Sequence, residues 1–87
     1  MTPVMSYDEL LSRNVALIDR VCHKQAAEGS RFIDDLDLDS IDLVGLVAEM
    51  EEEFGVIVGE ERLRAFQTVG DAVECLRALR NEGTNAT

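Results

Sequence analysis

Apolar residues near the N-terminus recur at helical spacing and predict a first helix over about residues 7–26. Its stripe consists of apolar side chains three or four positions apart, with neighbours that widen it: Leu10, Leu11, Val15, Leu17, Ile18, Val21 and Cys22. Ser6 and Glu9 have the spacing of a capping box, in which the Ser hydroxyl accepts from the Glu9 amide and the Glu side chain reaches back. Gly29 and Ser30 mark the loop that follows.

A second apolar stripe predicts a helix over residues 40–54. Its members are again three or four positions apart: Leu43, Leu46, Val47, Met50 and Phe54. Either Asp39 or Ser40 can cap its start, and Gly55 is typical of a helix end. Ile41, Val44 and Ala48 form another apolar row beside this stripe. That row is either an exposed contact surface or the half-buried edge of the core.

The remainder of the chain predicts two further helices and no sheet. Val56, Ile57 and Val58 are too few to form a sheet without a partner strand, so we interpret them as an extended connector. A short helix is expected over 60–65. Thr68 and Asp71 can cap a last helix over 69–81, whose stripe is Val69, Ala72, Val73, Leu76 and Leu79. The predicted fold is a small all-α four-helix bundle with a short third helix.

The length of 87 residues is typical of one domain, which we place at 6–81 between a flexible start (1–5) and a flexible tail (82–87). The formal net charge is −10, and residues 34–61 hold eleven Asp and Glu with no Lys, Arg or His. This balance excludes a nucleic-acid binder and disfavours an anionic membrane surface. It favours basic protein partners, although acidic residues often form only a solvated face.

Candidate targeting and redox features are sparse. No apolar run approaches the ~20 residues that span a bilayer, and the first residues lack a basic region and an apolar core, so we expect a cytoplasmic address. We also predict a monomer. The two Cys residues form no CxxC pair, which disfavours zinc and a disulfide framework. Cys22 and Cys75 lie on or beside apolar stripes, and we interpret them as packing residues.

The segment Phe32-Ile33-Asp34-Asp35-Leu36-Asp37-Leu38-Asp39-Ser40-Ile41-Asp42-Leu43-Val44 places a serine between an acidic loop and an acidic helix. It closely resembles the modification segment of acyl carrier proteins, whose pattern is Phe-x-x-Asp-Leu-Gly-x-Asp-Ser-Leu-Asp-x-Val. The likeness continues through 51–54, 56–58 and 68–73 and covers about residues 6–80. The resemblance implies the four-helix carrier fold.

The resemblance also implies a function without catalysis. Ser40 would receive 4′-phosphopantetheine from coenzyme A through a magnesium-using phosphopantetheinyl transferase, with Asp39 and Ile41 beside the attachment point. The thiol of that group would carry acyl intermediates as thioesters to an acyl-loading enzyme and to ketosynthases or other basic-surfaced enzymes. The residues expected to meet these partners lie on or next to the second helix: Asp39, Asp42, Val44, Ala48, Glu49, Glu51 and Glu52.

Departures from the family pattern bear on the pathway. Asp37 replaces a usual Gly, Gly45 a usual acidic residue, and Gly59 a common Pro. Among relatives in this family, peptidyl carriers usually have a Gly-rich approach to the serine, whereas this chain has Asp37-Leu38-Asp39, which favours acyl over aminoacyl cargo. The three departures favour polyketide or related specialised biosynthesis, with fatty-acid synthesis as the alternative.

Three other interpretations use the same residues. A calcium loop starting at Asp35 would need Gly at its sixth position and Glu at its twelfth, where Ser40 and Leu46 stand. A serine hydrolase would need an activated Ser40, but there is no Gly-x-Ser-x-Gly motif, and the single histidine, His23, ends the first predicted helix. We therefore predict no metal site and no catalytic residue. An unmodified acidic interaction module, with Ser40 as a plain helix cap, stays open.

Overall fold

The computed structural model describes residues 5–83, and four α-helices lie within that range. They are α1 (Tyr7–Cys22), α2 (Ser40–Phe54), α3 (Glu60–Leu63) and α4 (Val69–Gly83). The all-α fold with a short third helix is therefore confirmed. The helix α2 has its predicted bounds, and α4 continues two residues past its predicted end. Most of the two segments predicted to be flexible, 1–5 and 82–87, lies outside the described residues.

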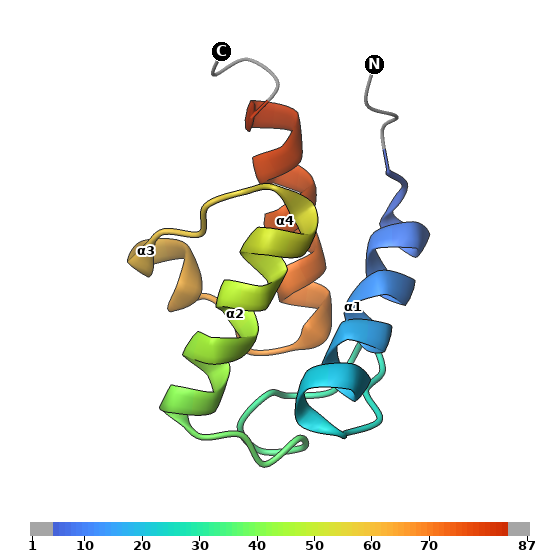
Figure 1. Cartoon of the computed structure of the whole chain (residues 1–87), viewed down its shortest axis with the longest axis vertical. Coiled ribbons are helices and arrows are strands. Elements are labelled where there is room, and N and C mark those ends of the chain that lie inside the picture. The colour runs from blue at the N-terminus through green and yellow to red at the C-terminus, as the bar shows by residue number, and fades with distance from the viewer. Residues whose placement is uncertain (1–4, 84–87) are drawn as a thin grey trace.

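The three long helices form the body of the bundle (Figure 1). Here α1 runs antiparallel to α2 and α4 and packs against both of them. A long loop crosses one end of the bundle from α1 to α2, and α3 lies on the opposite side of α2 from α1 (Figure 1). The start of α2 consequently lies at the end of the molecule away from the start of α1 and the end of α4.

The core is aliphatic with a few phenylalanines, as the composition requires. Its buried members come from α1, α2 and α4, from the loop between α1 and α2, and from the loop between α3 and α4. They are Leu10, Leu17, Ile18, Phe32, Leu36, Leu38, Leu46, Val47, Met50, Phe54, Phe66, Val69, Ala72, Val73 and Leu76. The rings of Phe32 and Phe66 stack with their centroids 6.3 Å apart, so one loop residue packs on another. Burial of these side chains, at roughly 25 cal/mol per Å² of apolar surface, is the main force that holds the loops onto the helices.

The predicted extension of α1 to residue 26 is wrong. The helix ends at Cys22 because His23 adopts a left-handed conformation, with φ of 58°, and its N–H donates to the Asp19 carbonyl at 3.0 Å. Beyond it, the Ser30 hydroxyl accepts from the Ala27 amide at 2.9 Å and closes a turn. Ala26 still packs against the core although it is no longer helical. Its apolar character therefore reflects tertiary packing and not continuation of the helix.

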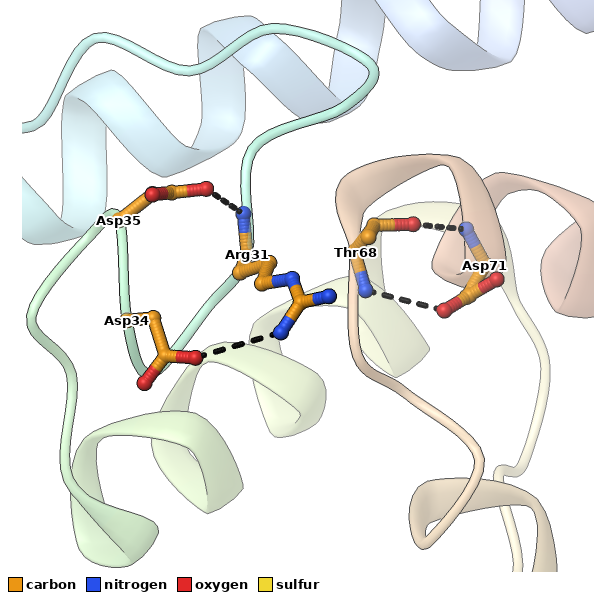
Figure 2. Close-up of polar contacts among 5 residues, drawn as sticks. All are labelled: Arg31, Asp34, Asp35, Thr68 and Asp71. Carbon is orange, nitrogen blue, oxygen red and sulfur yellow. Dashed lines mark hydrogen bonds and ion pairs between the residues drawn. The ribbon is translucent and has the colours of Figure 1, made fainter.

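Backbone hydrogen bonds fasten the loop after α1 to the start of α4. Phe32 donates to the Gln67 carbonyl, and Val69 donates to the Ser30 carbonyl, both at 3.0 Å, around an isolated bridge between Arg31 and Thr68. Figure 2 shows the side chains on either side of this bridge. These side chains form hydrogen bonds within their own segments, so the bridge joins two segments that are each ordered locally.

On the loop side of the bridge, two aspartate side chains bind Arg31. The Asp35 carboxylate accepts from the Arg31 amide at 2.8 Å, and Asp34 pairs with the Arg31 guanidinium at 3.4 Å (Figure 2). On the helix side, Thr68 and Asp71 cap α4 reciprocally, with bonds of 3.2 Å and 3.0 Å between each side chain and the other residue's amide. The predicted cap of the last helix is thus present.

An arginine side chain of α4 binds the C-terminal end of α2. Gly55 takes the left-handed conformation, with φ of 67°, that commonly ends a helix. The last turn of α2 holds no basic residue of its own. Instead, the Arg80 guanidinium donates to the Phe54 carbonyl at 2.9 Å, where a positive charge is favourable next to the negative end of the helix dipole.

Asn14 is the one buried polar residue among the described side chains. Its Nδ2 donates to the Leu10 carbonyl at 2.7 Å, whereas its Oδ1 has no hydrogen-bond partner within the described part of the chain. A buried acceptor without a donor costs about 1–3 kcal/mol. Asn14 therefore weakens the core that surrounds it.

We predict that Asn14→Leu raises the free energy of unfolding by about 1–2 kcal/mol, because it removes the unpaired oxygen and keeps a branched side chain of four heavy atoms. Urea denaturation followed by circular dichroism measures this. Asn14→Ala is the matched control, since it removes the same oxygen but leaves a cavity and should gain less or lose stability. A leucine variant less stable than the parent would show that the oxygen is satisfied in solution.

Tyr7, Glu28 and Gly70 join the start of α1, the following loop and the start of α4. The Tyr7 hydroxyl donates to the Glu28 carboxylate at 2.5 Å, and Gly70 donates its N–H to the Glu28 carbonyl at 2.9 Å. A Cβ at Gly70 would lie 3.2–3.3 Å from Glu28 and from the Tyr7 hydroxyl, so glycine permits this approach. The hydrogen bond to Glu28, with smaller contributions from burial and nearby carboxylates, raises the pKa of Tyr7 from 10.0 to about 12.

This shift predicts a stability change at alkaline pH. Because the folded pKa exceeds the unfolded value of 10.0, the stabilisation is fully present below pH 10 and disappears as the pH rises through about 12. Tyr7 is the single tyrosine of a chain without tryptophan, so tyrosinate absorbance reports its titration directly. We expect the midpoint of Glu28→Gln to fall towards 10.0, with circular dichroism at each pH to verify folding. Equal midpoints in both proteins would contradict the assignment.

Candidate functional site at the start of α2

Two aspartates build the first turn of α2. Asp39 is the N-cap, with extended backbone, and its Oδ1 accepts from the Asp42 amide at 2.8 Å. In return, the Asp42 carboxylate accepts from the Asp39 amide at 3.3 Å. This reciprocal pair is a capping box, and it places negative charge at the positive end of the helix dipole. Of the two cap candidates in the sequence, the structure uses Asp39.

Ser40 is consequently left without a capping role. It is the first residue of α2, its side chain is exposed, and no described residue forms a hydrogen bond with its hydroxyl. The amides of a first helical turn lack intrahelical acceptors and favour a phosphate group. A phosphodiester on this hydroxyl therefore fits the site sterically and meets the positive end of the dipole, with the carboxylates of Asp39 and Asp42 opposing it.

The loop before Ser40 is held by alternating buried residues. Phe32, Leu36 and Leu38 point into the core, whereas Asp37 between the last two is exposed. The Leu38 amide donates to the Phe32 carbonyl at 3.1 Å, which closes the loop over itself. Asp37 has φ of 56°, a left-handed conformation that aspartate tolerates better than most residues. The position where the family pattern has glycine thus keeps a glycine-like backbone.

The second apolar row of α2 faces solvent. Ile41 is 81% exposed and Val44 is 55% exposed, and Ala48 is exposed as well. This excludes the half-buried edge of the core, where side chains would be largely covered, and contact of the row with partners stays a prediction. Exposed branched residues on one helix face are typical of a surface that meets partners.

The acidic residues predicted to meet partners do not form one uniform set. Asp42, Glu49 and Glu52 are exposed, as a partner surface requires. Glu51 is half-buried, and its carboxylate accepts from the Val58 amide at 2.7 Å, so it holds the connector after α2 in place. Glu53, which was not among the predicted residues, pairs with Arg20 of α1 at 3.6 Å.

Among the described residues, no group of three or more His, Cys, Asp and Glu side chains is arranged to hold a metal ion. None of the helices described is both long enough and apolar enough to cross a membrane.

Comparison with known proteins assigns the family. The model of the phosphopantetheine attachment site family matches residues 15–76, which include the whole start of α2. The chain is an acyl carrier protein. It is 32% identical over 82 residues to an acyl carrier protein of Rhodococcus erythropolis, covering 91% of this chain and 90% of that one. An acyl carrier protein of Thermotoga maritima is 42% identical over 71 residues, covering 78% and 88%.

The fold of the carrier agrees with this assignment. A crystal structure of an acyl carrier protein from Thermotoga maritima superposes with a TM-score of 0.77 at 25% identity, covering 90% of this chain and 94% of that one. The family is one of carriers and not of enzymes, and its cofactor is phosphopantetheine. The predicted family, the non-catalytic role and the cofactor are therefore confirmed.

Proposed function

We propose that Ser40 is the attachment residue and that the protein carries acyl groups on it. The observation that supports this is the exposed Ser40 hydroxyl, which is unpaired among the described residues because Asp39 caps the helix instead. When bound, the phosphopantetheine group supplies a thiol on a long flexible arm, to which an acyl group is attached as a thioester. The protein's own residues hold the attachment point on a rigid turn and present charge and apolar contacts to partners.

The residues around Ser40 divide these tasks. Asp39 and Asp42 fix the first turn through their capping box, so the hydroxyl is presented in one orientation. Ile41, Val44 and Ala48 offer a small apolar row, and Glu49 and Glu52 offer exposed negative charge. Charge of this kind speeds encounter, and a small contact area keeps complexes short-lived. Both properties suit a carrier that must reach and leave a transferase, a loading enzyme and a ketosynthase in turn.

Intact mass spectrometry tests the proposal directly. The purified protein is incubated with coenzyme A, magnesium and a broad-specificity phosphopantetheinyl transferase. We expect the mass of one phosphopantetheine to be added, and fragmentation to locate it on Ser40. Addition at another residue would overturn the site, and no addition to a folded sample would favour an unmodified acidic interaction module.

We further propose that the carrier serves polyketide or related specialised biosynthesis in the cytoplasm, and that it acts as a monomer. The support for the pathway is the set of departures at Asp37, Gly45 and Gly59, which change the side chains around the start of α2 and along its exposed face but keep the backbone of the loop. Competition between a polyketide ketosynthase and a fatty-acid ketosynthase for the loaded protein tests this. Faster turnover by the fatty-acid enzyme would reverse the assignment.

A further inference from the structure

A groove of about 490 Å³ lies beside the start of α2. One wall is the end of α1 and the chain just after it, with Val21, Cys22 and Lys24. The other wall is the face of α2 that carries Ile41 and Gly45, and Leu38 of the loop joins the two. The groove therefore begins one residue from Ser40 and runs along α2 for at least a helical turn.

Gly45 has no packing reason to be glycine. A Cβ at this position would meet no atom within 4 Å, and the backbone φ of Gly45 is not positive. Glycine within a helix costs about 1 kcal/mol relative to alanine. What this glycine provides is open space in the wall of the groove, at a cost in stability that no neighbouring contact offsets.

The lining of the groove alternates apolar and polar groups. Val21 and Ile41 supply the exposed apolar surface, and the buried core residues Leu38 and Leu46 lie beneath it. Lys24 supplies a donor for carbonyl oxygens, whereas the carboxylates of Asp42 and Glu49 accept from amide and hydroxyl groups. A purely hydrocarbon chain would offer no hydrogen-bonding group to Lys24 or Glu49. The pantetheine arm, with a dimethyl group, a hydroxyl and two amides, matches both kinds of lining.

We propose that this groove is the resting site of the pantetheine arm attached at Ser40. The inference rests on the proposed function, because the tether must begin at that hydroxyl. A tethered group has an effective concentration in the millimolar range, so a weak site with few contacts suffices to hold it. Seating the arm here places its chain against α1, on the side of α2 away from α3.

Chemical shifts test the site. The apo and holo proteins, labelled with ¹⁵N and each verified by intact mass, are compared residue by residue. We expect holo-specific shifts at Val21, Cys22 and Lys24, which are distant in sequence from Ser40. In Gly45→Leu, whose side chain fills the groove, these shifts should disappear, whereas Ala48→Leu on the exposed row should keep them. Shifts confined to residues 39–43, or unchanged in Gly45→Leu, would overturn the groove.

Gly45→Ala distinguishes two explanations for this glycine, namely that it leaves space for the arm or that the fold requires it. It should stabilise the helix and at the same time reduce the shifts at Val21 and Cys22, because the added methyl group enters the groove. A glycine needed only for folding would instead make the alanine variant less stable. Such a loss, with the holo shifts unchanged, would count against the proposal.

Cys22 provides an independent proximity test. Burial raises the pKa of its thiol, the Asp42 carboxylate adds to this, and Lys24 opposes it, so exchange is carried out at mildly alkaline pH. With oxidised glutathione, the arm thiol and the Cys22 thiol together lose two hydrogens and form one disulfide, and glutathione disulfide is reduced to two thiols. Cys75, which lines a separate hollow with Ala65 and Phe66, is the internal comparison.

We expect the arm to crosslink to Cys22 about tenfold faster than to Cys75, as a docked tether requires. Peptide mapping identifies the pair, and Gly45→Leu should remove the preference. Equal rates at the two cysteines would overturn the docking. If phosphopantetheine is not added at Ser40, the proposed function and this inference both fail. If the holo protein forms but shows neither the chemical-shift changes in the groove nor the preference for Cys22, only the groove is overturned.

Discussion

Ser40→Ala is expected to abolish the addition of phosphopantetheine and to leave the fold essentially unchanged. The substitution removes an exposed hydroxyl that has no hydrogen-bond partner among the described residues, at the first position of α2. Exposed substitutions away from caps usually change stability by about 0.5 kcal/mol or less. Intact mass should show no gain, and urea denaturation should give a free energy of unfolding near that of the parent.

The neighbouring aspartate is the matched control. Asp39→Ala keeps the Ser40 hydroxyl but removes the capping bond to the Asp42 amide, so it should cost about 0.5–2 kcal/mol. Asp39→Asn keeps an acceptor for that bond and removes the charge, which isolates recognition by the transferase from stability. If Ser40→Ala were the more destabilised protein, Ser40 and not Asp39 would be the cap. The free hydroxyl that supports the proposed function would then be lost.

The sequence predicted the helices wherever a long stripe and a local stop signal coincide. The helix α2 shows this best, because its stripe ends at Phe54 and Gly55 follows. The end of α1 was missed because no glycine or proline stands near His23, the residue whose left-handed backbone stops the helix. Tertiary packing of Ala26 decides the path of the chain there, and local sequence does not encode it.

Within the site, spacing held more information than residue type. Asp39 and Ser40 are equally good caps by type, but only Asp39 has an acidic residue three positions later, which is the capping-box spacing. That signal was available in the sequence. The bond from Val58 to Glu51 was not, because it spans seven residues and depends on the turn at Gly55. The groove beside α2 depends on the early end of α1 and could not be predicted from the sequence either.

The exposed acids of α2 should govern encounter with basic partners. We predict that Glu49→Lys combined with Glu52→Lys lowers kcat/KM for a phosphopantetheinyl transferase about tenfold at low ionic strength, since steering of this kind raises association rates by 10–10³. Both side chains are exposed, and no hydrogen bond or ion pair joins either of them to another described side chain. Reversing them should therefore alter the field of the surface more than the fold.

Salt dependence and the half-buried Glu51 distinguish electrostatic steering from structural damage. At about 1 M salt the Debye length falls to ~3 Å, so the rates of parent and variant should converge. Glu51→Gln is the comparison: it also removes an acid from this helix but leaves an acceptor for the Val58 amide, so stability should hold and the rate change little. Glu51→Lys, in contrast, removes the acceptor and should loosen the connector after α2. A double variant that stays slow at every salt concentration, or matches the parent at low salt, would show that these charges do not guide encounter.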